Sequence, residues 1–230
     1  AKAQDFLCNQ AERLEQLARV ETADNGATDD LVVNGVVNAT GALTLNAGDN
    51  AVVNFNLIAT TSVTVNVDAA DNDAAGGVFS LVLPATITAP TGAFLNGAAD
   101  NDTFNFAPQT GAAITLDGLA PPTVPGDILN IDISALTNPL LTLQGQGAGT
   151  WTFDAPLQPV VYTSIETVVP DDAYHLRLLA SGTSFGNTGV ADNIVIRRDS
   201  VVPTDLVIER TGVLNAPNDF VGVIFQGPLA

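Results

Sequence analysis

From Leu31 onward the chain consists of short runs in which apolar residues alternate with Asn or Thr, separated by Gly, Asn, Asp and Pro. A period of two places one face of a strand in a core and leaves the other face polar. No helical period interrupts the runs, which argues against a helix-linked α/β fold and predicts an all-β protein. The most regular runs are Ala42–Leu45, Val52–Leu57, Val63–Val67, Val78–Leu83, Phe104–Phe106, Ile114–Leu116 and Ile128–Ile133.

One turn sequence is repeated between these runs. The sequence Ala69–Asp73 recurs unchanged as Ala98–Asp102. Gly48–Asn50 and Ala191–Asn193 are shorter, partial copies of it. The spacings between the first three copies are close to the length of one turn of a β-solenoid, in which stacked Asn side chains hydrogen-bond along the sheet. The sequence therefore predicts a β-solenoid or parallel β-helix-like body over residues 27–170. A Greek-key β-sandwich, in which turns recur about every 8 to 12 residues, is the alternative.

The first segment has a different period. Apolar residues at spacings of three and four predict an amphipathic helix from Ala1 to about Glu21, stopped by Asp24–Gly26. Its stripe includes Leu7, Leu14 and Leu17. Such a helix is too short to be stable alone, so residues 1–26 are predicted to form a cap on the β body, or to dock on a neighbouring subunit through these leucines.

The last segment is predicted to form an antiparallel β unit over residues 171–230. Its longer alternating runs are Tyr174–Ala180, Asn193–Arg198, Asp205–Arg210 and Phe220–Gln226.

The charge balance narrows the classes of partner. The chain has 230 residues, 25 Asp and Glu against 7 Lys and Arg, and a formal net charge of −18. No Lys or Arg occurs between Val20 and Leu176. A surface of this charge repels phosphate backbones and anionic lipids, so no nucleic acid partner is expected. No apolar run is long enough for a transmembrane helix, so no membrane insertion is expected.

The composition also bears on location. The chain contains no methionine, one lysine (Lys2) and one cysteine (Cys8). We expect a processed protein that is secreted to the extracellular space or cell surface, with Cys8 as a small buried apolar residue or a site of cross-linking. One cysteine excludes an internal disulfide, and one histidine excludes a multi-histidine metal site.

The strongest chemical candidate is a calcium site. Gly97–Phe104 is a degenerate match to the Gly-Gly-x-Gly-x-Asp-x-apolar-x repeat of calcium-binding β-rolls. Asp100 and Asp102 would offer carboxylates from one turn, and Asp71 and Asp73 form the matching pair. Asx turns that satisfy their own backbone amides are the alternative for the same residues.

No catalytic constellation is found in the sequence. His175 lies in an alternating run, and no nucleophile elbow or phosphate loop is present. Acid pairs such as Asp71 with Asp73 or Asp171 with Asp172 could mimic the carboxylates of polysaccharide-active solenoids. Trp151 and Tyr162 are predicted to pack in the core, with an exposed glycan platform as the alternative.

Three stretches carry a resemblance to a known class of proteins. Gly118–Asp132 resembles a module of very large secreted bacterial β-strand-repeat surface proteins, and Gly149–Phe153 with Pro159–Val168 is similar to that module's ending. Ala191–Gly212 is similar to the hairpin that commonly follows. The resemblance implies a cell-surface or matrix role in repeat arrays and no catalytic role.

Together these features predict a non-enzymatic extracellular structural module of a bacterial surface layer, adhesin or filament. Self-association, or contact with neighbouring repeat modules, would use strand edges or end-to-end stacking. A calcium-dependent or glycan-binding adhesion domain is the first alternative, with Ca²⁺ as ligand, and a polysaccharide-active β-helix enzyme is the second.

Overall fold

The computed structural model describes residues 17–22, 29–69, 75–120, 126–145, 147–172, 175–178, 193–198, 206–211 and 222–225. Within these ranges the protein is all-β and contains no helix, so none that could cross a membrane. The prediction of an all-β protein is therefore confirmed for the described part of the chain.

The described strands form two nine-stranded sheets and one three-stranded sheet. The first sheet has the order β1 (Leu17–Glu21), β4 (Ala42–Asn46), β7 (Ser62–Asn66), β10 (Gly92–Asn96), β12 (Ile114–Asp117), β16 (Val160–Thr163), β15 (Ala148–Thr152), β14 (Leu140–Gly145) and β18 (His175–Leu178). The second has the order β19 (Asn193–Arg198), β20 (Leu206–Thr211), β21 (Gly222–Phe225), β17 (Thr167–Pro170), β13 (Ile128–Ile131), β11 (Thr103–Phe106), β8 (Val78–Leu81), β5 (Ala51–Val53) and β2 (Leu31–Val33). The third contains β3 (Val37–Ala39), β6 (Leu57–Ala59) and β9 (Ile87–Thr88).

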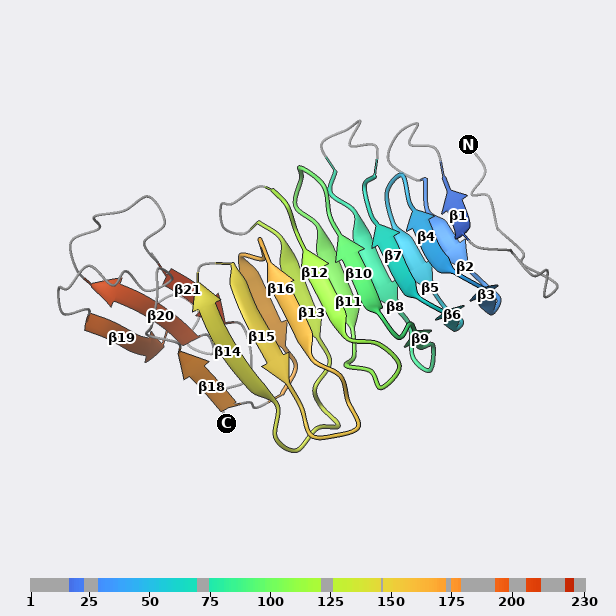
Figure 1. Cartoon of the computed structure of the whole chain (residues 1–230). Coiled ribbons are helices and arrows are strands. Elements are labelled where there is room, and N and C mark those ends of the chain that lie inside the picture. The colour runs from blue at the N-terminus through green and yellow to red at the C-terminus, as the bar shows by residue number, and fades with distance from the viewer. Residues whose placement is uncertain are drawn as a thin grey trace.

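From β2 to β10 the chain visits the second, third and first sheets in turn, and from β11 to β17 it moves between the second and first sheets only. We call each passage from one second-sheet strand to the next second-sheet strand a circuit. Strands of successive circuits pair in parallel, as in β2 with β5, β3 with β6 and β4 with β7. The strands consequently lie side by side along an elongated body (Figure 1). The circuits differ in length: equivalent asparagines are 20 residues apart at Asn46 and Asn66, and 30 apart at Asn66 and Asn96.

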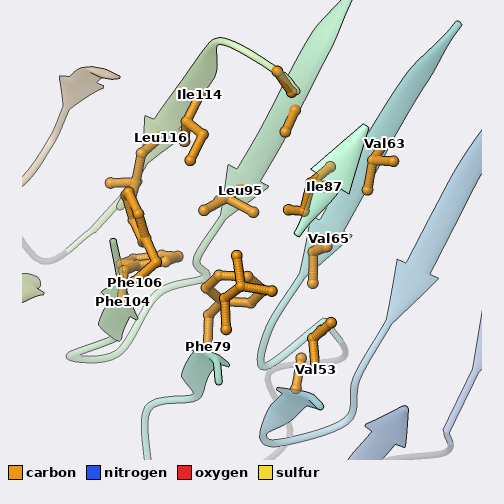
Figure 2. Close-up of a cluster of buried hydrophobic side chains, with 14 of the residues drawn as sticks. Val53, Val63, Val65, Phe79, Ile87, Leu95, Phe104, Phe106, Ile114 and Leu116 are labelled. Atoms are coloured by element: carbon orange, nitrogen blue, oxygen red, sulfur yellow. The ribbon is translucent and has the colours of Figure 1, made fainter. Parts of the chain in front are cut away.

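The core lies between the sheets and consists of the inward-facing residues of the alternating runs. Phe79, Phe104, Leu95 and Ile87 are at most 1% exposed and come from all three sheets. Figure 2 shows these side chains gathered in the space between the strands. Burying a Leu, Ile or Phe side chain contributes about 1.5–3 kcal/mol, so this continuous apolar interior stabilises the stacking of the circuits.

The repeated turn occupies matching places in this topology. The second copy, Ala98–Asp102, connects β10 to β11, and the first copy falls between β7 and β8. β7 pairs with β10 and β8 pairs with β11, both in parallel. Of the first copy only Ala69 lies within the described residues. The two copies thus join equivalent strands of neighbouring circuits.

The predicted N-terminal helix is wrong at its C-terminal end. Leu17–Glu21 forms β1, which pairs in parallel with β4. Val20 packs against the core while Arg19 and Glu21 are exposed, so the residues alternate as in a strand. Backbone pairing with β4 and the burial of a β-branched residue outweigh the helical spacing here. Leu7, Leu14 and Cys8 lie outside the described residues.

The C-terminal strands continue the two large sheets. β19, β20 and β21 pair with one another in antiparallel fashion, and β21 then pairs with β17 in parallel. β18 differs from the expected antiparallel unit because it runs parallel to β14. Strands on both sides of residue 170 therefore share the same sheets.

Antiparallel pairing also occurs earlier, where β14, β15 and β16 form successive antiparallel pairs. Gly149 makes room there, because an added Cβ would overlap the ring of Tyr162. The pairing among β1–β13 is parallel throughout, which is incompatible with a Greek-key sandwich for this part of the chain.

Candidate functional sites: an acid column and an outer groove

The predicted calcium residues have different surroundings. Asp71 and Asp73 lie outside the described residues. Asp100 is partly exposed, whereas Asp102 is fully buried. The carboxylate of Asp102 accepts hydrogen bonds from the backbone N–H groups of Gly77 and Ala98, both at 2.6 Å. Its oxygens are thus directed into the corner between strands.

Asp102 belongs to a series of acids at equivalent positions just before the second-sheet strands. We define the acid column as Asp49, Asp102, Asp127 and Glu166. In each case a carboxylate oxygen accepts the backbone N–H of the equivalent residue one circuit earlier. The donors are Asp29 for Asp49 (2.5 Å), Gly77 for Asp102 (2.6 Å), Asp102 for Asp127 (2.7 Å) and Asp127 for Glu166 (3.0 Å). The column therefore links the circuits at one corner.

Glycines make room for two of these carboxylates. An added Cβ at Gly97 would overlap Oδ2 of Asp102, and one at Gly118 would overlap Oδ2 of Asp127. Gly97 and Gly118 are themselves on neighbouring circuits, since each follows a paired first-sheet strand. Each of these two buried carboxylates therefore occupies space that a side chain at the nearby glycine would otherwise fill.

Asp127 is the most perturbed member of the acid column. It is 0% exposed, and its Oδ2 has no hydrogen-bond partner among the described residues. Burial raises the pKa of Asp127 to about 8; the N–H of Asp102 opposes the rise, and the carboxylates of Asp102, Glu166 and Asp117 add to it. Burial also raises the pKa of Glu166. At neutral pH the Asp127 carboxyl is therefore mostly protonated.

A groove of about 710 Å³ lies on the outer face of the second sheet, and we call it the outer groove. It crosses β8, β11, β13 and β17 near their C-terminal ends. Its lining side chains fall into a polar row, an acid pair and an apolar rim. These are Ser80, Asn105 and Asn130; Asp132 and Asp171; and Val82 and Leu83.

The polar row is a hydrogen-bonded ladder. Nδ2 of Asn130 donates to Oδ1 of Asn105 at 2.6 Å, and Nδ2 of Asn105 donates to Oγ of Ser80 at 3.3 Å. The three residues are in register on β13, β11 and β8. The ladder holds the amide planes at fixed positions across the groove.

The acid pair lies on neighbouring circuits at the end of β13 and just after β17. Oδ1 of Asp132 accepts hydrogen bonds from the hydroxyl and N–H of Ser134, at 2.7 and 3.2 Å. Oδ1 of Asp171 accepts the N–H of Ile133 at 2.6 Å. The Ser134 hydroxyl lowers the pKa of Asp132, whereas partial burial raises the pKa of Asp171, and a hydrogen bond between the two carboxyls acts in the same directions. The pair therefore retains a proton on Asp171 more readily than on Asp132.

A second ladder lies on the outer face of the first sheet. Nδ2 of Asn96 donates to Asn66 at 2.7 Å, Asn66 donates to Asn46 at 2.6 Å, and Asn46 donates to Oε1 of Glu21 at 3.0 Å. Glu21 also forms an ion pair with Arg19. Hydrogen bonding between stacked asparagines, expected from the sequence, is confirmed at both ladders.

Exposed apolar residues gather at one corner, between the second and third sheets. Val36, Phe55, Val82 and Leu83 are 44% to 62% exposed and come from three successive circuits. Val82 and Leu83 also form the rim of the outer groove.

The aromatic residues considered for a glycan platform are not at the surface. Trp151 is 0% exposed and Tyr162 is 2% exposed, and both belong to the hydrophobic core. Within the described ranges no group of three or more His, Cys, Asp or Glu side chains is placed to hold a metal ion. The outer groove was not found from the sequence because its two acids lie far apart along the chain.

Comparison of the chain with protein-family models, with curated proteins and with solved structures finds no match.

Proposed function

We propose that this protein is a non-enzymatic structural module of an extracellular bacterial surface layer, adhesin or filament, whose body is a β-solenoid. Support comes from the circuits between β2 and β10, which pair in parallel in all three sheets, and from the asparagine ladders that run across neighbouring circuits. Stacked circuits resist extension along the body because every circuit is bonded to the next. The composition, with one lysine and one cysteine, supports an extracellular location.

The observation that carries this proposal is the edge of the first circuit. β2 and β3 each pair on one side only, with β5 and β6, and have no other strand partner among the described residues. Unpaired strand edges are templates for pairing with another chain. A second copy of the protein can continue the sheets at this edge, which gives linear assembly by strand addition.

The geometry of β2 provides a sharp test. Leu31 donates to Asn50 of the next circuit, and Val33 accepts from Asn54, so the N–H of Val32 between them points to the open edge. Val32→Pro removes that donor without removing a bond between β2 and β5. Val32→Thr keeps the N–H and is the matched control.

The test is light scattering together with negative-stain microscopy over a range of protein concentrations. The wild type and Val32→Thr are expected to form linear oligomers that grow with concentration, and Val32→Pro is expected to remain smaller. A wild type that stays monomeric throughout contradicts the proposal. If Val32→Pro assembles as well as the wild type does, the edge of β2 is not the site of contact between copies.

We propose a glycan-binding adhesion domain as the second candidate, because the outer groove combines a polar row with an apolar rim. A calcium-dependent form of this function predicts that a chelator lowers the melting temperature. An unchanged melting temperature counts against calcium.

A further inference from the structure

We infer that the outer groove binds a glycan bearing protonated amino groups. This rests on the second candidate function and not on self-assembly. Three features of the groove match such a ligand: the ladder of Ser80, Asn105 and Asn130, the acid pair Asp132 and Asp171, and the exposed rim of Val82 and Leu83.

The ladder offers polar groups in a regular row. Within the ladder Asn105 uses one N–H and one oxygen lone pair, and Asn130 uses one N–H, so each amide keeps a second N–H and at least one lone pair for a ligand. Neighbouring strands are about 4.8 Å apart, so these groups recur along the length of the groove. A ligand with regularly spaced hydroxyls can meet them without rearrangement of the side chains.

The rim supplies an apolar surface beside this row. Val82 is 44% exposed and Leu83 is 62% exposed. A sugar ring has C–H faces as well as hydroxyl edges, so a chain of sugars can contact the rim with one and the ladder with the other. A purely apolar or purely polar ligand would leave one of the two surfaces unsatisfied.

The acid pair determines the charge of the ligand. The segment from Val20 to Leu176 contains no Lys or Arg, so it brings no lysine or arginine side chain of its own to these carboxyls. The chain as a whole carries −18, which repels polyuronates and sulfated glycans. An ammonium group placed between Asp132 and Asp171 can donate charge-assisted hydrogen bonds to both carboxylates.

The site differs from a metal site in its ligand set. No third acid, His or Cys among the described residues joins the pair. Two carboxylates and the neutral amides provide fewer oxygen ligands than the roughly six to eight that calcium coordinates. A directional donor such as an ammonium fits this geometry better than a bare divalent ion.

The test uses three oligosaccharides of equal length in titration calorimetry: glucosamine oligomers, N-acetylglucosamine oligomers and galacturonate oligomers. The pH is chosen so that the amines are protonated. The glucosamine oligomers are expected to bind best, and galacturonate oligomers are expected not to bind. Adding salt should weaken binding of the glucosamine oligomers, since an ionic contact is screened.

Variants separate the groove from general charge effects. Asp132→Asn and Asn105→Ala are each expected to weaken glucosamine-oligomer binding by about tenfold or more, as loss of a hydrogen bond to a charged or polar group predicts. Asp100→Asn makes the same change in net charge at a partly exposed site outside the groove, and should bind as the wild type does. Circular dichroism and melting curves establish that each variant is folded.

The other outcomes overturn the inference. If the acetylated oligomers bind equally well, an ammonium group is not required. If Asp132→Asn binds as the wild type does, the acid pair does not contact the ligand. If the wild type binds none of the oligomers, the groove is not a glycan site. Light scattering on the same samples reports assembly independently, so failure here is distinguishable from failure of the structural role.

Discussion

The backbone N–H of Asp102 donates to Oδ1 of Asp127 at 2.7 Å, although the two residues lie on different circuits. The same Asp102 uses its own carboxylate to bind two N–H groups of its surroundings. Each acid therefore hydrogen-bonds its own circuit to the one before it. Because Asp127 is buried between two other acids, the stability of this connection depends on whether Asp127 is protonated.

The stability of the protein should depend on the protonation of Asp127. Its pKa is raised from 3.8 to about 8 on folding, so between these values the folded state holds a proton that the unfolded state has lost. The free energy of unfolding should therefore fall as pH rises through this window, by up to about 1.4 kcal/mol per pH unit, and level off above it. Asp127→Asn mimics the protonated carboxyl and should remove this part of the slope.

Denaturant unfolding of the wild type and Asp127→Asn over the same pH series measures the difference between their slopes. At the low end of the window the two proteins should have similar stability. Parallel curves throughout would show that Asp127 is not the group responsible.

Gly97→Ala should destabilise the corner that holds Asp102. The new Cβ would overlap Oδ2 of Asp102 and approach the carbonyl of Gly118. We expect a loss of about 1–3 kcal/mol, typical of overpacking at a buried site. Because the clash involves the carboxylate, Gly97→Ala and Asp102→Ala should be less than additive when combined. Fully additive losses in denaturant unfolding would place the strain elsewhere.

Asn66→Ala should cost more stability than Asn96→Ala. Asn66 both donates to Asn46 and accepts from Asn96, whereas Asn96 only donates in this ladder. Each lost hydrogen bond is worth about 1 kcal/mol, so the two variants should differ by about that amount. Asn101→Ala, at an exposed loop position, serves as the control for loss of an asparagine. Equal effects of Asn66→Ala and Asn101→Ala in thermal melts would argue against a stabilising ladder.

Phe104→Ala should be among the most destabilising single changes. Phe104 is 0% exposed, and its truncation leaves a cavity that costs about 3–5 kcal/mol. Phe55 is 46% exposed, and Phe55→Ala should cost about 1 kcal/mol or less. The comparison is made by denaturant unfolding. Similar losses at the two positions would contradict the assignment of inside and outside at the corner near Phe55.

Prediction from sequence worked best where alternation alone decides burial. In Val63–Val67 the valines at 63, 65 and 67 are buried and the polar residues between them are not, as the period of two requires. The run Val52–Leu57 shows the limit of this signal. It was expected to be one strand, but it divides into β5 and β6 with a corner at Asn54–Asn56. Alternation continues through that corner, so the sequence pattern does not mark it.

The helical prediction failed at Leu17–Glu21 for a related reason. Spacings of three and four fit a helix, but the same residues also fit a strand once β4 offers its edge for pairing. Local periodicity contains no information about whether such an edge exists. The outer groove was missed in the same way, because the ladder and the acid pair are each assembled from separate circuits.

The order of amino acids by itself determined the class of the fold, the alternation of buried and exposed positions, the excess of acids and the Asn residues that form ladders. Tertiary structure alone decided which acids share a corner or a groove. The reason is that successive circuits differ in length, so equivalent positions do not recur at a constant spacing. Only the pairing of β13 with β17 brings Asp132 beside Asp171, and only the stacking of corners buries Asp127 between Asp102 and Glu166.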